Sequence, residues 1–166
     1  MVLPLTGSQS SYGEDALTAI KLAHQELKET NPSLHKHVRL LVEDDKSRPS
    51  GAKAAGQQLI KQRASAMIGA FTHSTSWALS EVAQKSKKPL IIPAACSSEF
   101  LKQGDHVFRA CTPEKWQGNL LSQFAYHDLK AKKAVVIYDP KSSHAHDIAQ
   151  HFSASFKTKN SVSLHK

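Results

Sequence analysis

The stretch GAFTHSTSW, residues 69–77, gathers side chains that could take part in chemistry. Four hydroxyl groups and the imidazole of His73 lie between an apolar run, residues 66–69, and a segment with helical periodicity, residues 77–83. Such a cluster can cap the helix that follows it, or it can hold a ligand. Ser and Thr hydroxyls beside the free N–H groups of a helix start are suited to a carboxylate.

Catalysis by these residues would need more than the sequence offers. A nucleophilic Ser or Cys requires a base within hydrogen-bond reach, and a third group must orient that base. His73 and Ser74 are neighbours in the chain, and such side chains rarely point at each other. No GxSxG motif surrounds any serine. A hydrolase on a flavodoxin-like sheet is therefore a remote alternative, and we do not expect an enzyme.

Nucleotide cofactors and metal ions also lack their usual motifs. Phosphate-binding loops are rich in glycine, and neither GxGxxG nor GxxxxGK[ST] occurs. The pairs His35/His37 and His144/His146 could each give a metal two ligands, but no third ligand is indicated. We therefore expect neither a cofactor nor a metal.

The totals fit a globular protein rather than a disordered or membrane-spanning one. The 166 residues suffice for a domain with a hydrophobic core, and no apolar run approaches the ~20 residues of a membrane span. The first five residues lack the features of a signal peptide. The net charge is +8, but the basic residues cluster only at 85–88 and 130–133, where a helix should end and cations complement its dipole. No nucleic-acid partner is expected.

Cys96 and Cys111 have neither CxxC spacing nor a metal-ligand pattern. Both follow apolar runs, so buried free thiols are the default expectation. The sequence leaves open a disulfide between them.

Apolar periodicity predicts alternating strands and helices. Helices are expected at residues 14–29, 49–62, 75–86, 116–124 and 148–156, and strands at 38–43, 65–69, 89–93, 107–110, 134–138 and 161–164. The alternation predicts an α/β fold with a Rossmann-like parallel sheet and helices on both faces. Ligands of such sheets bind outside the carboxyl ends of the strands. Small polar tips follow three predicted strands, near residues 73, 96 and 144, and should converge on one hollow.

Five segments resemble one family in order and spacing. They are PLTGSQSSYGEDAL, VRLLVEDDKSRPSGAKAAGQQLI, IGAFTHSTSWALSEVAQKSKKPLIIPAACSSEF, VFRACTPEKWQGNLL and AVVIYDPKSSHAHDIAQHF. The family is the type I periplasmic binding proteins, typified by the leucine/isoleucine/valine-binding proteins of bacterial ABC transporters. The resemblance implies two Rossmann-like lobes that close on an amino acid or similar small molecule without catalysis. It also implies a periplasmic or extracellular location and an ABC permease as partner.

A set of ligand-binding residues follows, most of it carried over motif by motif from the family. The set is Tyr12, Phe71, Thr72, His73, Ser74, Ala94, Ala95, Cys96 and His144. The resemblance implies that the Ala94 carbonyl takes the ligand's ammonium group; Ala95 is added because a small residue lets a ligand approach the main chain. His73, Cys96 and His144 stand where the family has a serine, a threonine and a tyrosine. Two interpretations stay open: an altered ligand, or a lost pocket in a sensory or interaction module.

Length is the other departure, because relatives of this type are about twice as long. The resemblance implies an N-terminal ligand-binding lobe at residues 1–129 and a partial second lobe, strand–helix–strand, at residues 130–166. The apolar strand 134–138 and the helix stripe of Ile148, Phe152 and Phe156 would then have too few partners. We expect this remnant to pack on a second copy as a homodimer, or to be only partly ordered. A lone lobe should bind its ligand weakly.

Overall fold

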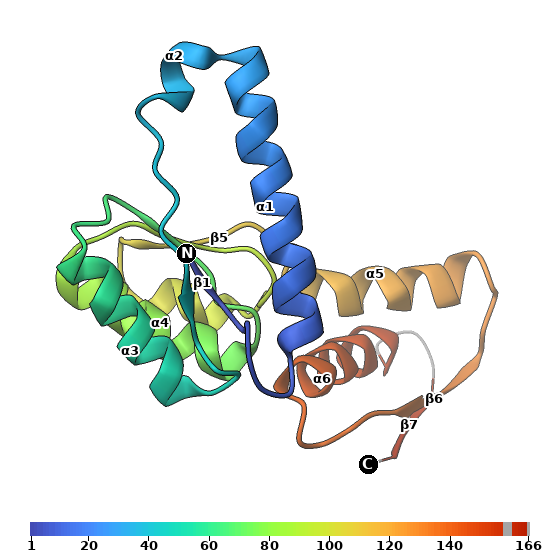
Figure 1. Ribbon diagram of the computed structural model, residues 1–166. Helices are drawn as coiled ribbons and strands as arrows, with labels where there is room; N and C mark the ends of the chain where they lie inside the picture. The colour runs from blue at the N-terminus through green and yellow to red at the C-terminus, as the bar shows by residue number, and fades with distance from the viewer. Residues whose placement is uncertain (158–160, 166) are drawn as a thin grey trace. The chain divides into compact units, whose positions relative to one another are not determined.

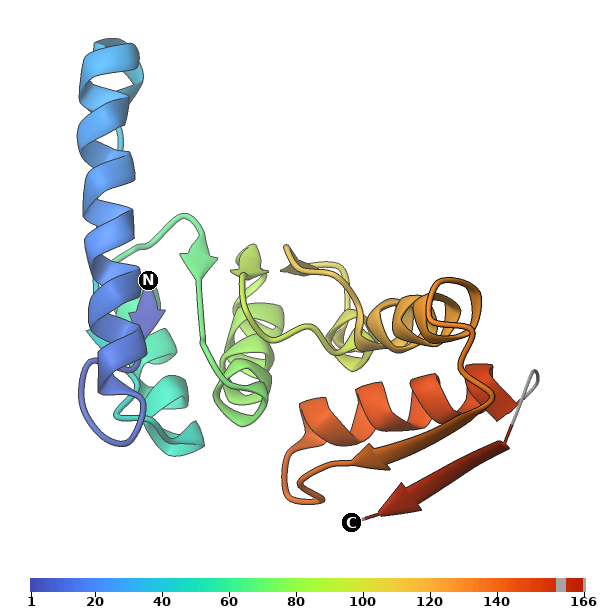
Figure 2. The same ribbon diagram turned by 90° about the vertical axis from the view of Figure 1, so that its right-hand side faces the viewer.

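The computed structural model describes residues 1–157 and 161–165 of the chain. The chain forms two compact units. The first comprises residues 1–95 and 99–110, and the second comprises residues 96–98 and 111–166. Figures 1 and 2 show the helices and strands in two views at right angles.

The first unit alternates strands and helices along the chain. Its strands are β1 (Val2–Leu3), β2 (Glu43–Asp44), β3 (Met67–Ile68), β4 (Leu90–Ile92) and β5 (Val107–Arg109). Its helices are α1 (Ser10–Thr30), α2 (Pro32–His35), α3 (Pro49–Lys61) and α4 (His73–Ser86). A 3-10 helix, η1 (Ser98–Gln103), starts in the second unit and continues into the first. The three helices predicted between residues 14 and 86 are confirmed.

Every strand pair of the first unit is parallel. β1 pairs with β2, and β3, β4 and β5 form a sheet in that order. The two small sheets meet at Gly69, where an added β-carbon would lie 2.3 Å from the carbonyl oxygen of Val2. Only glycine permits so close an approach of two main chains. The predicted α/β class, with parallel strands and helices on both faces, is confirmed.

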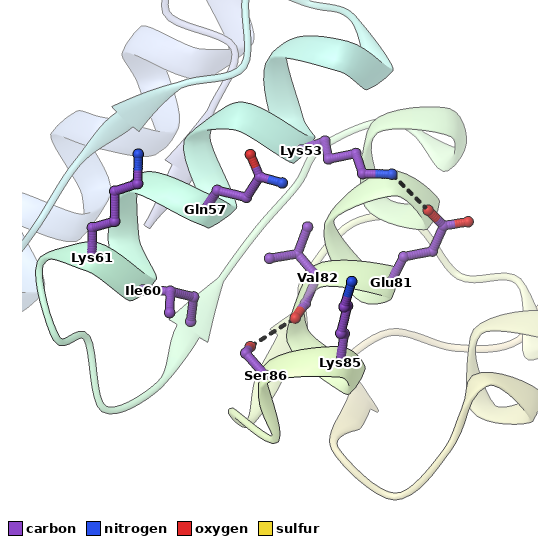
Figure 3. Close-up of a pocket in the computed structure, with 8 residues that line it drawn as sticks. All are labelled: Lys53, Gln57, Ile60, Lys61, Glu81, Val82, Lys85 and Ser86. Carbon is purple, nitrogen blue, oxygen red and sulfur yellow. Dashed lines mark hydrogen bonds and ion pairs between the residues drawn. The ribbon is translucent and has the colours of Figure 1, made fainter.

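The core of the first unit lies between these strands and helices α3 and α4. Its fully buried side chains include Leu59, Leu79, Leu90, Ile92 and Phe100. The two helices lie side by side, and Lys53 Nζ of α3 is 3.7 Å from Glu81 Oε2 of α4 (Figure 3). The helices are in close contact at Gly56, where a β-carbon would lie 2.7 Å from Leu79 Cδ1.

The predicted strand at residues 38–43 is wrong for all but its last residue. Within the described structure, β1 pairs only Val2 and Leu3 with β2, so residues 38–42 take part in no ladder despite their apolar sequence. A short helix, α2, was also not expected after Asn31. It forms because the Asn31 side chain accepts a hydrogen bond from Leu34 N at 3.0 Å and proline occupies the first helical position.

The second unit contains α5 (Glu114–His127), β6 (Lys133–Ile137), α6 (Ser143–Lys157) and β7 (Ser161–His165). β6 and β7 are parallel, with Lys133 opposite Ser161 and Ile137 opposite His165. Helix α5 packs against α6 and therefore belongs to this unit. The chain thus divides near residue 110, whereas the sequence placed the second lobe from residue 130.

The apolar stripe of α6 has a partner after all. Phe156 is fully buried, and its ring centroid lies 5.5 Å from that of Phe152. At Gly118 of α5, an added β-carbon would lie 2.7 Å from the backbone nitrogen of Phe152, so the two helices are in close contact. The expectation that this stripe has too few partners was wrong, because α5 was assigned to the first lobe. Val135 and Ile137 of β6 are nevertheless 65% and 82% exposed.

A membrane span requires a helix that is both long and apolar. No helix among the described residues combines the two properties to the extent that a span needs.

Candidate ligand-binding site

The polar cluster after β3 caps helix α4. Thr72 is the N-cap residue; its Oγ1 accepts a hydrogen bond from Thr75 N at 3.4 Å, and its own N–H donates to Thr75 Oγ1 at 3.2 Å. This reciprocal arrangement is a capping box, and it stabilises the helix start. Thr75 is buried at 1% exposure. Capping thus accounts for Thr72 and Thr75 and leaves His73 and Ser74 unexplained.

His73 is framed by two aromatic rings of the first unit. Its ring centroid lies 5.0 Å from that of Phe100 and 6.4 Å from that of Trp77, whose ring is nearly parallel to it at 11°. Trp77 is four residues further along α4, so it shares a helix face with His73. Phe100 comes from η1 and is fully buried. These contacts hold the imidazole half-buried at the helix start.

His73 and Ser74 line a hollow of about 510 Å³ that also includes Pro49, Ser50 and Trp77. The hollow therefore touches the first turns of both α3 and α4. Backbone N–H groups without intrahelical partners and the positive end of the helix dipole favour an anion at such a position. A small carboxylate ligand would find hydroxyl, imidazole and amide donors there.

Tyr12 and Phe71, two further predicted residues, lie next to each other at the same end of the unit. The Tyr12 and Phe71 rings stack with centroids 5.3 Å apart and planes 22° apart. Tyr12 belongs to the first turns of α1, and Phe71 follows β3. The close approach of Gly69 to Val2 brings the chain segments that carry them together. Tyr12 is 53% exposed, which leaves part of its ring accessible to a ligand.

Ala94 and Ala95 follow β4, the parallel neighbour of β3. Gly69 N donates to Ile91 O at 3.0 Å, so the segments that leave the two strands start at the same edge of the sheet. Ala94 is exposed, whereas Ala95 is 7% exposed. The predicted residues of the first unit, numbers 12, 71–74 and 94–95, therefore all lie at the carboxyl ends of its parallel strands.

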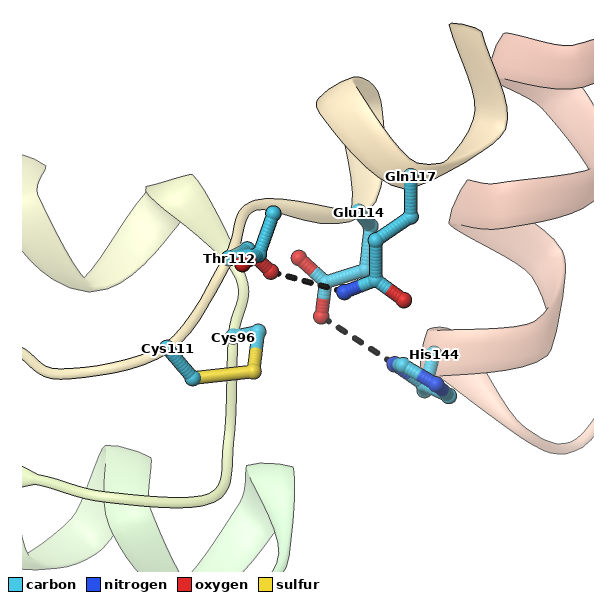
Figure 4. The surroundings of a disulfide bond; sticks show 6 residues. All are labelled: Cys96, Cys111, Thr112, Glu114, Gln117 and His144. Atoms are coloured by element: carbon cyan, nitrogen blue, oxygen red, sulfur yellow. Dashed lines mark hydrogen bonds and ion pairs between the residues drawn. A yellow bond between two sulfur atoms is a disulfide. The ribbon is translucent and has the colours of Figure 1, made fainter. Parts of the chain in front are cut away.

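Cys96 and Cys111 form a disulfide, with Cα atoms 5.4 Å apart (Figure 4). The default expectation of free thiols was therefore wrong. Both residues belong to the second unit, although the segment between them contributes β5 to the first. An oxidised Cys96 has no S–H group, so it cannot donate the hydrogen bond that a threonine would give.

His144 lies beside a buried carboxylate in the second unit. Its Nδ1 is 3.3 Å from Oε1 of Glu114 (Figure 4), and the side chains are 56% and 5% exposed, respectively. Glu114 starts α5, and His144 lies in the first turn of α6. Nearby, Gln117 Nε2 donates to the carbonyl oxygen of Thr112 at 2.7 Å. The contact between Glu114 and His144 joins the N-terminal turns of two packed helices.

Asp44 ends β2 and Asp45 follows it, and both carboxyl groups accept hydrogen bonds from nearby residues of the first unit. Burial tends to raise the pKa of Asp44, but hydrogen bonds from Thr6, Lys46 and Leu5 outweigh it and lower that pKa. For Asp45, burial dominates and raises the pKa, although Ser47 N donates to Oδ1 at 2.7 Å. Asp44 thus ties the loop before α1 to β2.

The described residues hold no group of three His, Cys, Asp or Glu side chains that could bind a metal ion.

A family model described as periplasmic binding protein matches residues 1–161. The chain belongs to this family. The resemblance found in the five sequence segments is therefore confirmed. The family is one of solute-binding proteins, not enzymes, and its members are periplasmic or extracellular.

Relatives of this periplasmic binding protein chain include two curated bacterial proteins. An amino acid binding protein of Pseudomonas aeruginosa is 28% identical over 138 residues, which are 82% of this chain and 37% of the relative. The Leu/Ile/Val-binding protein homolog 3 of Brucella melitensis is 22% identical over 166 residues, 99% of this chain and 45% of the relative. The chain thus spans less than half the length of these relatives.

Two solved structures show the same architecture. A leucine binding protein, LivK, from Thermotoga maritima gives a TM-score of 0.83 at 28% identity, covering 99% of this chain and 47% of the other. LivJ from Streptococcus pneumoniae, a branched-chain amino acid transporter substrate binding protein in complex with isoleucine, gives 0.86 at 27% identity, covering 98% and 47%.

Sequence reasoning missed three residues that shape these surroundings. Trp77 and Phe100 frame His73, and Glu114 contacts His144. The spacing of His73 and Trp77, four residues apart in a predicted helix, is a signal that could have paired them. Nothing in the sequence marks Phe100 or Glu114. A glutamate at a helix start is usually an exposed partner of the helix dipole, so its burial is not foreseeable.

Proposed function

We propose that this periplasmic binding protein chain is a solute-binding component, or part of one, of a branched-chain amino acid type ABC transporter. Its ligand is an amino acid or a similar small molecule with a carboxylate, and it is bound without catalysis. The observation that carries the proposal is the hollow beside His73 and Ser74, where the first turns of α3 and α4 offer donors to an anion. Family membership supports the same class of ligand, as does the similarity to a leucine binding protein and to a substrate binding protein in complex with isoleucine.

Within this proposal, the ligand's carboxylate contacts Ser74, His73 and the N–H groups at the start of α4. We assign the apolar part of the ligand to the stacked rings of Tyr12 and Phe71, which follow β1 and β3 at the same end of the unit but do not themselves line the hollow. The main chain at Ala94 and Ala95 takes the ammonium group of an amino acid. The resemblance implies a threonine hydroxyl donor at position 96, and the disulfide leaves no side-chain donor there. This favours a ligand that needs no hydrogen bond from a side chain at position 96.

His144 and the second unit complete the proposed component. The residues from about 111 onward are the start of a second lobe, in which His144 is a candidate ligand contact. The exposed side chains of Val135 and Ile137 support a homodimer through this lobe. The disulfide supports an oxidising location such as the periplasm, where an ABC permease would receive the ligand.

A thermal-shift screen with the twenty amino acids and simple aromatic acids tests the ligand assignment. A ligand present at about 100 times its Kd stabilises the folded state by about 2.7 kcal/mol, which raises the Tm by several degrees. We expect at least one hit, and His73→Ala and Ser74→Ala should each weaken it at least about tenfold in titration. The matched controls His37→Ala and Ser33→Ala, which are exposed in the first unit, should leave its affinity unchanged.

Two outcomes would contradict the proposal. Silence across the panel would favour the second candidate, a sensory or interaction module that reuses the lobe; the oxidised Cys96 is the observation that favours it. A hit that is insensitive to both His73→Ala and Ser74→Ala would place the ligand elsewhere. Light scattering at several concentrations tests the homodimer, which a monomer at all of them would contradict.

A further inference from the structure

A groove of about 530 Å³ lies between helices α3 and α4 of the first unit (Figure 3). Helix α3 lines it with Lys53, Ile60 and Lys61, and helix α4 lines it with Glu81, Val82 and Lys85. Lys53 and Glu81 also line the hollow beside His73. Their ion pair therefore lies where the groove adjoins that hollow, while Ile60, Lys61, Val82 and Lys85 line only the groove.

The far part of the groove carries excess positive charge. Lys53 is paired with Glu81 at 3.7 Å, whereas Lys61 and Lys85 are exposed and have no carboxylate partner among the described residues. Each lies in the last turn of its helix, where a cation complements the dipole. Dipole compensation explains each lysine separately, but it does not require both to border one groove.

The floor of the groove between these lysines is apolar. Val82 is 8% exposed, and Ile60 is partly buried and packs against the core. A small inorganic anion would satisfy the lysines but leave this apolar floor uncovered. A second copy of this chain has more cationic than acidic side chains, with a net charge of +8, so at this groove it complements two unpaired lysines less well than an acidic segment does.

We propose that the groove between α3 and α4 docks an acidic segment of a partner protein, in which carboxylates flank an apolar side chain. The carboxylates contact Lys61 and Lys85, and the apolar side chain covers Ile60 and Val82. Charge complementarity of this kind speeds association and orients the partner. The proposal is independent of the ligand hollow, because the residues that carry it do not include His73 or Ser74.

The test uses a fluorescent amphipathic peptide made of Glu and Leu, with a peptide of Glu alone as the second probe. Fluorescence anisotropy should show salt-dependent binding of the first peptide to the wild-type chain. The double variant Lys61→Gln/Lys85→Gln should bind it about tenfold more weakly. The control Lys21→Gln/Lys36→Gln has the same net charge, alters exposed lysines away from the groove, and should lose less than about twofold.

Three results would overturn the proposal, provided that the Tm of each variant shows it to be folded. One is the absence of binding by the Glu–Leu peptide at low salt. Another is a result that shows attraction by net charge alone. Either both double variants bind the Glu–Leu peptide equally weakly, or the wild-type chain binds the Glu-only peptide as tightly as the Glu–Leu peptide. The third is a dimer that the Lys61→Gln/Lys85→Gln variant abolishes, which would make a second copy the occupant.

Discussion

Nδ1 of His144 lies 3.3 Å from Oε1 of Glu114, and this contact links the first turns of α5 and α6. Because Glu114 is 5% exposed while His144 is about half exposed, the imidazole covers a carboxylate that is otherwise nearly withdrawn from water. Removing the imidazole should leave that carboxylate without its partner.

A double-mutant cycle measures this coupling. We expect His144→Ala and Glu114→Ala each to lower the free energy of unfolding by about 1 kcal/mol, because each leaves the other group without its hydrogen bond. The double variant should lose less than the sum of the two, by about 0.5 kcal/mol or more. Urea unfolding gives the values, and strict additivity would show that the contact contributes nothing.

The disulfide should be the largest single contribution to stability among these features. Its cysteines are 15 residues apart, and for a loop of that length the chain-entropy model gives about 3 kcal/mol. Cys96→Ser/Cys111→Ser should therefore lower the free energy of unfolding by about that amount, measured with denaturant. Adding a reductant to the wild-type chain should reproduce the loss, and the variant itself should not respond to the reductant. A wild-type chain indifferent to the reductant would contradict the assignment.

Gly118→Ala tests the close packing of α5 on α6. Alanine favours a helix over glycine, yet its β-carbon would lie 2.7 Å from Phe152 N and 2.8 Å from Ile148 O. Since both are backbone atoms, the helices must move apart, and we expect a loss of about 1–3 kcal/mol in thermal or urea unfolding. Gln123→Ala, on an exposed position of the same helix, should change stability by less than about 0.5 kcal/mol. Unchanged or increased stability in Gly118→Ala would mean that the helices are not so close.

The neighbouring carboxyls Asp44 and Asp45 predict opposite pH dependences. Hydrogen bonds lower the pKa of Asp44 below its ordinary 3.8, so its ionised form stabilises the fold above that pH, and this stabilisation is lost as pH falls through the lowered pKa. Asp44→Asn should cost about 1 kcal/mol at pH 7 and nothing in strong acid. A difference that persists unchanged into strong acid would contradict this assignment.

Asp45 provides the contrast. Burial raises its pKa above 3.8, so the wild-type chain loses stability as pH rises through that raised value. In Asp45→Asn this loss should disappear, so the free energy of unfolding of the variant should rise relative to that of the wild type as the pH increases. Urea unfolding at a series of pH values measures both variants. If Asp45→Asn instead lost ground to the wild type toward neutral pH, the pKa of Asp45 would be lowered rather than raised.

Segments with a regular apolar spacing could be predicted from the sequence. Segments whose structure depends on a neighbour far along the chain could not. Helices α1, α3 and α4 follow from apolar spacing, and the Thr72 to Ser76 cluster marks the start of α4. Residues 38–42 look like a strand, yet a strand needs a neighbour, and here β1 supplies only Val2 and Leu3. Local pattern carries no information about such a neighbour.

The candidate site shows the same division. Its strand-end residues could be located because parallel strands present their carboxyl ends at one edge. The disulfide between Cys96 and Cys111 and the burial of Glu114 depend on which chain segments meet in space. The packing of Phe100 against His73 likewise joins residues 27 positions apart. Spacing within one sequence does not specify those meetings.

The glycine at position 56 has a consequence for the kinetics of docking. Because Leu79 packs closely over Gly56, α3 and α4 cannot slide past each other without a clash or separate without losing this packing, so we expect the surface between them to exist before any partner arrives. Association there should be a single-exponential process whose rate rises linearly with peptide concentration, with no slow rearrangement after the encounter.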